Sequence, residues 1–84
     1  MPRYQFEIRS PSHLLFSRRV VLDNLAQVGV EASARMGELL QDQPARLWTD
    51  EHWELSVCDD DGVVRWVIEV IGREADGASC GWNG

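Results

Sequence analysis

The feature that most constrains the fold is a change to two-residue alternation between His52 and Ile71. Apolar and polar side chains alternate in two runs that flank an acidic, glycine-containing segment. Successive side chains of a strand point to opposite faces, so each run predicts a strand with one apolar row. Two such strands around a turn segment indicate a β-hairpin. The rows are Trp53, Leu55 and Val57 in the first strand, and Val64, Trp66, Ile68 and Val70 in the second.

The hairpin register follows from burying both rows together, which requires odd-numbered residues of the first strand opposite even-numbered residues of the second. A two-residue Asp61-Gly62 turn meets this condition but places Glu54 opposite Glu69, and like charges in that position are unfavourable. A four-residue loop sets Glu69 opposite His52, and we expect this register. The competitor is a three-residue loop with a G1 bulge at Gly62. In its register the apolar row of the first strand lies opposite polar residues of the second, with Val57 opposite Arg65.

The acidic segment Asp59-Asp60-Asp61-Gly62 predicts a turn. With Gly62 at position 6 of a calcium-binding loop, positions 1 and 12 would be Val57 and Ile68, which cannot act as ligands. Asp59 can instead accept a hydrogen bond from an N–H group two residues on, as an Asx-turn. We therefore assign no metal site.

Two further strands and a helix precede the hairpin. Tyr4, Phe6 and Ile8 alternate with polar residues, which predicts a strand over residues 3–9, and two apolar clusters predict a second strand over residues 14–22. Asn24 can cap a helix, and Pro44 ends its continuation. The helix carries a stripe within about 120° of arc, formed by Leu25, Val28, Ala32, Met36, Leu39 and Leu40.

The 84 residues allow one small domain. We expect an α+β fold over residues 1–71: a mostly antiparallel sheet of three or four strands in the order β-β-α-β-β, with one amphipathic helix packed on one face. Residues 72–84 are rich in glycine and lack periodicity, which predicts a flexible C-terminal tail.

The net charge of −6 argues against nucleic acid as a partner, because phosphate binding needs clustered basic residues. The absence of a long apolar run argues against a membrane span, and the N-terminal residues lack the apolar region of a secretory signal, so we expect a cytoplasmic protein. Cys58 and Cys80 are expected to be reduced thiols.

Few residues suggest catalysis. Cys58 and His52 lie too far apart on one strand to form a dyad, and only a dyad with His13 through folding stays open. Trp53 and Trp66 belong to the apolar rows and are expected in the core, whereas Trp48 and Trp82 are candidates for exposed contacts. We therefore expect no enzymatic activity, no catalytic residues and no cofactor.

Three parts of the chain carry a family resemblance: the opening Met1-Pro2-Arg3-Tyr4, the helix with Glu31-Ala32, and the ending that runs from Trp53 through Val57 and Asp59 to Asp61-Gly62. Together they resemble a family of short uncharacterised bacterial proteins, a domain of unknown function. The resemblance covers residues 1 to about 71 and implies two strands, a helix and a hairpin. It implies no activity and no site residues.

A single helix covers one face of such a sheet and leaves the other face with more apolar residues than an ordinary wet surface. We therefore expect a cytoplasmic protein-interaction module that forms a homodimer or binds a protein partner through a sheet face or edge. The candidate interface residues are Val63, Arg65, Val67, Glu69 and Ile71. The alternative is a regulatory domain that binds a small anionic ligand or nucleic acid on a sheet face bearing Arg3, Arg9, Arg65 and Arg18-Arg19.

Overall fold

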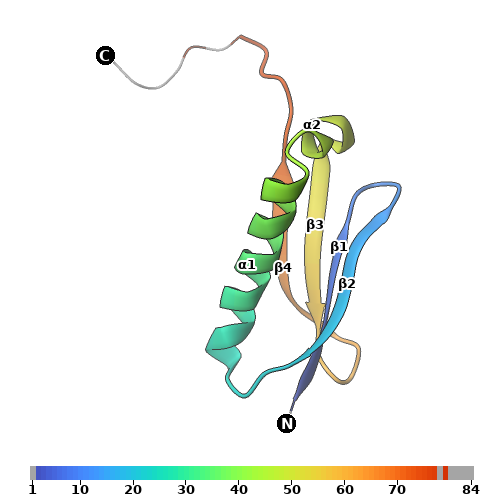
Figure 1. The fold of residues 1–84 in the computed structure, drawn as a ribbon, viewed down its shortest axis with the longest axis vertical. Helices are drawn as coiled ribbons and strands as arrows, with labels where there is room; N and C mark the ends of the chain where they lie inside the picture. The colour runs from blue at the N-terminus through green and yellow to red at the C-terminus, as the bar shows by residue number, and fades with distance from the viewer. Residues whose placement is uncertain (1, 78, 80–84) are drawn as a thin grey trace.

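The computed structural model describes residues 2–77 and 79, which contain one antiparallel sheet, a long helix along one side of it and a short helix at its end (Figure 1). The sheet has four strands in the spatial order β2-β1-β3-β4, so β2 and β4 are its edges. This arrangement confirms the expected α+β class with an antiparallel sheet. The elements along the chain are β1 (Arg3–Arg9), β2 (Leu14–Val21), α1 (Leu25–Asp42), α2 (Arg46–Asp50), β3 (His52–Cys58) and β4 (Val64–Ile71).

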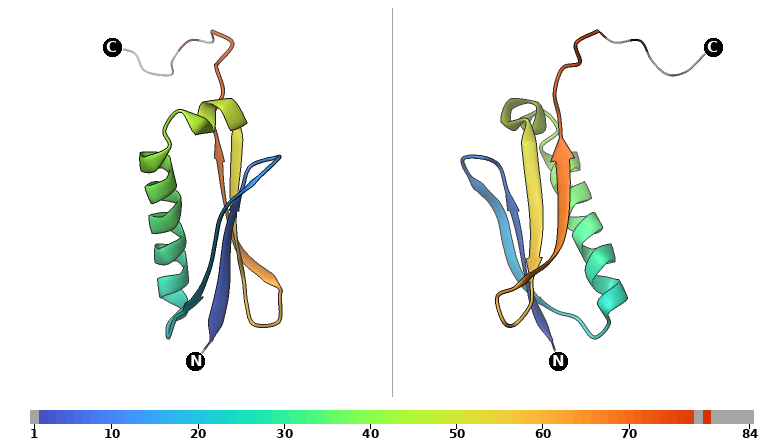
Figure 2. Two further views of the ribbon diagram at one scale, coloured as in Figure 1. Left: turned by 45° about the vertical axis from the view of Figure 1, so that its right-hand side comes forward. Right: turned by 180° about the vertical axis from the view of Figure 1, so that it is seen from behind.

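Helix α1 lies along one face of the sheet and leaves the opposite face uncovered (Figure 2). Its N-terminus is capped as expected, because Asn24 Oδ1 accepts a hydrogen bond of 2.8 Å from the N–H of Ala26. The expected stripe supplies Val28, Ala32 and Met36 to the core. These pack with the buried strand residues Tyr4, Phe6, Ile8, Trp53, Leu55 and Val57.

A second, short helix was not expected from the sequence. Pro44 follows the end of α1, but the chain then forms α2 instead of entering β3 directly, so the observed order is β-β-α-α-β-β. Leu47 anchors α2 because its side chain is buried in the core. Arg46 and Asp50 form an ion pair of 3.1 Å one turn apart, and Glu51 ends the helix in the left-handed region with a φ of 68°.

The turn of the β3–β4 hairpin differs from the expected four-residue loop. The N–H of Gly62 donates to the carbonyl of Asp59 at 3.0 Å, and the N–H of Asp59 donates to the carbonyl of Val63 at 3.0 Å. Gly62 has a φ of 78°, a conformation that glycine adopts without a Cβ penalty. The tip is therefore the three-residue turn with a left-handed glycine, and the four-residue prediction is wrong.

A three-residue loop alone would pair odd-numbered residues of β3 with odd-numbered residues of β4. A bulge next to the turn shifts the pairing by one residue and restores the odd-to-even pairing. Cys58 pairs with Val64, but Val57 pairs with Trp66, so Arg65 is an extra residue in β4. Beyond the bulge Trp66, Ile68 and Val70 face the same side as the apolar row of β3, as the sequence predicted, whereas Val64 pairs with Cys58 and is exposed, so its place in the predicted row is wrong. Turn and bulge together give the strand pairing that a regular two-residue turn would have given.

The end of the chain is only partly described. The expected boundary at residue 71 and the tail over residues 72–84 stay predictions, and residues 78 and 80–84, including Cys80 and Trp82, lie outside the described residues. Gly72 is buried, and its N–H donates to the carbonyl of Glu51 at 3.0 Å. In the described part of the chain, no helix has the length and apolar character needed to cross a membrane.

Candidate functional site

The face of the sheet that α1 does not cover, here called the open face, carries exposed and half-buried side chains from all four strands. It is placed by the pairing: residues directly opposite in neighbouring strands point to the same side. Gln5 is opposite both Arg19 and Cys58, and Glu54 is opposite both Arg9 and Glu69. The face comprises Arg3, Gln5, Glu7, Arg9, Leu14, Ser17, Arg19, Val21, His52, Glu54, Ser56, Cys58, Val64, Val67, Glu69 and Ile71.

The apolar side chains of the open face lie on its two edge strands. On β4, Val67 is 50% exposed and Ile71 is 63% exposed, and on β2, Leu14 and Val21 are 49% and 52% exposed. The central strands β1 and β3 carry polar side chains on this face. The open face therefore has a polar centre and two mixed margins, in which Ser17 and Arg19 on β2 and Glu69 on β4 separate the apolar side chains, and it is not one continuous apolar patch.

The five residues predicted as an interface lie along β4 and the turn before it. Val67, Glu69 and Ile71 alternate on the open face, and Arg65 occupies the bulge. Val63 lies in the turn and is also exposed. The structure thus brings these residues to one edge of the sheet.

The arginines predicted to share one sheet face are divided by the structure. Arg18 is opposite Phe6, a core residue, so it lies on the side of the helix. Arg9 forms an ion pair of 3.2 Å with Glu7, and Arg65 forms one of 2.8 Å with Asp59. These contacts neutralise two of the expected cations.

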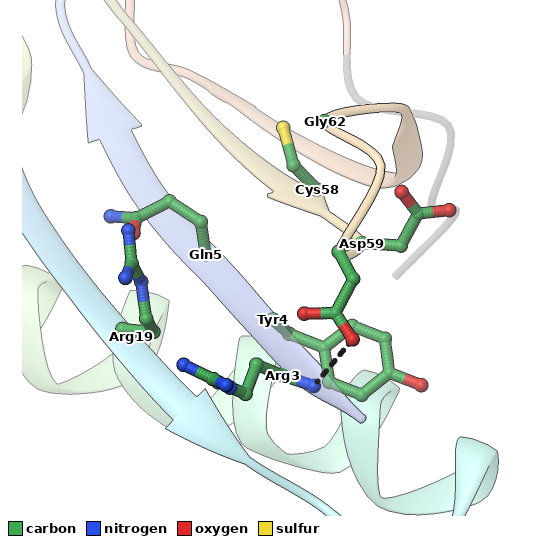
Figure 3. Close-up of a pocket in the computed structure, with 8 residues that line it drawn as sticks. Arg3, Tyr4, Gln5, Arg19, Cys58, Asp59 and Gly62 are labelled. Atoms are coloured by element: carbon green, nitrogen blue, oxygen red, sulfur yellow. Dashed lines mark hydrogen bonds between the residues drawn. The ribbon is translucent and has the colours of Figure 1, made fainter. Parts of the chain in front are cut away.

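Arg3 and Arg19 remain, and together they line a hollow at the hairpin end of the open face (Figure 3). The hollow has a volume of about 470 Å³, and Gln5 and Cys58 line it as well. Within the described residues, neither guanidinium group forms an ion pair. Asp60 lies at the rim, where its Oδ2 accepts a hydrogen bond of 3.4 Å from the backbone N–H of Arg3.

The acidic turn uses its first carboxylate to hold its own backbone. Asp59 Oδ1 accepts from the N–H groups of Asp61 at 2.9 Å and Val63 at 3.1 Å, and Oδ2 accepts from Arg65 Nε at 2.8 Å. The contact with Asp61 confirms the predicted Asx-turn. The hydrogen bond from Arg65, with that from the N–H of Val63, lowers the pKa of Asp59 below its ordinary value. Its oxygens are thus engaged within the hairpin.

A second carboxylate with a lowered pKa lies at the other end of the molecule. Asp50 Oδ2 accepts hydrogen bonds from Trp53 Nε1 at 2.8 Å and from Arg46 Nε at 3.1 Å. The Trp53 contact is the main cause of the lowered pKa, and Arg46 adds to it. Trp53 is fully buried, as expected, and this bond satisfies its only polar atom.

The remaining sequence candidates are dispersed. His13 lies in the loop after β1, hydrogen bonded to Ser12, whereas Cys58 is opposite Gln5 near the other end of that strand. His13 is level with Ser10, whose N–H donates to the carbonyl of His13, and Ser10 lies five residues beyond Gln5, about 16 Å at 3.3 Å per residue, so a dyad of Cys58 with His13 does not form. Trp48 is exposed, as predicted, and Trp66 is partly buried in a T-shaped contact with Tyr4.

Comparison with known proteins places the chain in a family. A model of the family described as "Domain of unknown function (DUF6894)" matches residues 3–72, which include all four strands and both helices. The chain belongs to this DUF6894 family. No curated protein and no solved structure matches the chain significantly.

In this DUF6894 domain, sequence reasoning missed one group of side chains on the open face. One nitrogen of His52 and one oxygen each of Glu54 and Glu69 all lie within 4.8 Å of one another. Glu54 is directly opposite Glu69, the pairing rejected from the sequence because of its like charges. The alternation predicted His52 and Glu54 on one side of the strand, and the expected register set Glu69 opposite His52, whereas the structure sets it opposite Glu54. The correct pairing therefore requires the bulge to be known.

Proposed function

We propose that this DUF6894 domain is a non-catalytic cytoplasmic interaction module that forms a homodimer through the open face. The observation that carries the proposal is the exposure of large aliphatic side chains on a sheet face that α1 cannot reach. Val67 and Ile71 on β4 are joined by Leu14 and Val21 on β2. Burial of an aliphatic side chain contributes about 1.5–3 kcal/mol, so covering both margins supports association.

Two polar pairs in the centre of the face support the same proposal, whereas Glu54 and Glu69, which have no such partner among the described residues, oppose it. Gln5 Nε2 donates to Ser17 Oγ at 2.7 Å, and Arg9 pairs with Glu7 at 3.2 Å. Polar groups with partners cost less to remove from water than groups without them. A second copy is the favoured occupant because one patch then supplies both sides of a two-fold interface.

The test is the mass of the wild-type chain by sedimentation at tens of micromolar, with two matched variants. Val67→Arg places a charge in the β4 margin and should give a folded monomer. Val30→Arg is the control, because Val30 is exposed on α1, and this variant should remain dimeric. Circular dichroism shows that both variants are folded. A wild-type mass of one chain, or equal dissociation of both variants, would remove the proposal.

A second candidate, binding of a small anion, is favoured by the hollow that Arg3 and Arg19 line. Guanidinium groups bind phosphate and carboxylate through paired hydrogen bonds. The adjacent Asp60 and the net charge of −6 oppose this candidate. Titration with inorganic phosphate tests it: amide resonances of β1 and β2 should shift in the wild type and not in Arg19→Ala, and unchanged spectra in both would eliminate it.

A further inference from the structure

The group formed by His52, Glu54 and Glu69 lies on the open face at the end remote from the hairpin turn. His52 and Glu54 point to the same side because they are two residues apart on β3. Glu69 reaches the same place from β4, since it is directly opposite Glu54. Two neighbouring strands therefore supply one imidazole and two carboxylates to one point.

The two carboxylates are brought together without a cation. Arg9 is opposite Glu54 on its other side, but its guanidinium pairs with Glu7 at 3.2 Å. Within the described residues, neither Glu54 nor Glu69 takes part in an ion pair or a side-chain hydrogen bond. Like charges in directly opposite positions destabilise a sheet, so a bound cation would relieve a cost that the register imposes.

We propose that His52, Glu54 and Glu69 form a binding site for one divalent transition-metal ion of the Zn²⁺ type. Imidazole nitrogen and carboxylate oxygen are ordinary Zn²⁺ ligands, at about 2.0–2.2 Å from the ion. Donors on a tetrahedral ion at such distances lie about 3.4 Å apart. The three donors already lie within 4.8 Å of one another, and small side-chain rotations close the difference.

The ligand set also determines which ion is expected. Mg²⁺ and Ca²⁺ prefer oxygen donors only, and Mg²⁺ keeps most of its water, so an imidazole favours a softer transition metal. Three protein ligands leave a fourth position for water on this exposed strand edge. Glu54 and Glu69 would then be neutralised, and the ion would tie the edge strand β4 to β3.

The site is separate from the acidic turn, where Asp59 is engaged with its own hairpin. It is also separate from the thiol of Cys58, which is opposite Gln5 at the other end of β3. These two groups therefore provide matched controls for nonspecific binding to carboxylates and for binding to a thiolate.

The experiment uses the full chain, treated with a chelator, dialysed and titrated with Zn²⁺ alone. Calorimetry should give one ion per chain. Because the ion binds the folded state, the melting temperature should rise by about 5–10 °C when free Zn²⁺ is tenfold above its dissociation constant. Mg²⁺ at the same concentration should give no rise. Absence of Zn²⁺ binding, or equal rises with Zn²⁺ and Mg²⁺, would overturn the site.

Four variants test the assignment of ligands. Glu69→Gln should abolish the Zn²⁺-dependent rise while slightly raising the melting temperature of the metal-free chain, because it removes the repulsion with Glu54. His52→Asn should also abolish the Zn²⁺-dependent rise. Asp60→Asn and Cys58→Ser should keep it in full. A rise that survives in Glu69→Gln, or disappears in Cys58→Ser, would place the ion elsewhere.

The outcome is independent of the proposed self-association. The mass of the metal-free wild-type chain reports the homodimer, and the Zn²⁺ titrations of the wild type and of the ligand variants report the metal site. A chain that is monomeric but binds Zn²⁺ through His52 would eliminate only the dimer, and a dimer indifferent to Zn²⁺ would eliminate only the metal site.

Discussion

The two faces of the sheet are made from the same strands but are held together differently. On the covered face, Phe6, Ile8 and Leu55 are fully buried against α1, and the polar atom of Trp53 is satisfied by Asp50. On the open face, Gln5 pairs with Ser17 across two strands and Arg9 with Glu7 along one strand, and Glu54 and Glu69 have no ion pair among the described residues. Stability is therefore expected to come mainly from the covered face, and substitutions on the open face should change the free energy of unfolding less.

The largest expected change in the free energy of unfolding comes from a substitution in α1 on the covered face. Ala32 is buried in the covered face, so Ala32→Asp places an unpaired charge in the core and should lower the free energy of unfolding by about 3–5 kcal/mol. Ser33→Asp lies on the exposed side of α1 and should change it by less than about 0.5 kcal/mol. Urea denaturation measures both variants. Equal losses would show that the covered face does not dominate stability.

An intermediate effect is expected at the hairpin turn, which decides the side to which each β4 residue points. Gly62 has a φ of 78°, so Gly62→Val should lower the free energy of unfolding by about 1–2 kcal/mol through backbone strain. A Cβ at this position would meet no atom within 4 Å, so the loss cannot come from a clash. Gly37→Val, at another open position, should cost less by urea denaturation. A smaller loss at Gly62 would contradict the left-handed turn.

The smallest expected effect is a pH-dependent change in melting temperature at Asp50, the partner of the buried Trp53. The pKa of Asp50 is lowered by Trp53 and Arg46, so the ionised form stabilises the fold above the unfolded pKa of about 3.9. That stabilisation is lost as the pH falls through the lower pKa of the folded state. Asp50→Asn should therefore melt below the wild type at pH 7, and the gap should narrow towards about pH 2. A gap that is constant with pH would remove the role of the carboxylate charge. Asp42→Asn, exposed at the end of α1, is the control and should show little difference at either pH.

The elements were largely predictable because their signals are local. Alternation around Phe6 and Leu55 placed two strands, the stripe through Val28 and Ala32 placed the core side of α1, and Asn24 marked its start. Helix α2 was missed because five residues are too few to show a helical period, and its anchor, Leu47, is recognisable only once the core is known.

The candidate site was less predictable because it depends on register. Pairing odd-numbered residues of β3 with even-numbered residues of β4 places both apolar rows on one side, but this rule is also met when β4 slides by two residues along β3. The repulsion between Glu54 and Glu69, which costs about 0.2–1 kcal/mol at an exposed position, argued against the observed register. The hydrogen bonds that Asp59 makes in the three-residue turn outweigh this repulsion. The bulge at Arg65 has no recognisable sequence pattern.

That bulge has a consequence for how far the sheet can be extended by other chains. β4 is an edge strand, and a foreign strand could add to its free backbone groups only where the ladder is regular. Arg65 interrupts the ladder near the turn, so the regular stretch is limited to residues 66–71. A foreign strand can therefore pair with β4 only along these six residues, and because the bulge lies in the backbone, substitutions of exposed side chains leave this limit in place.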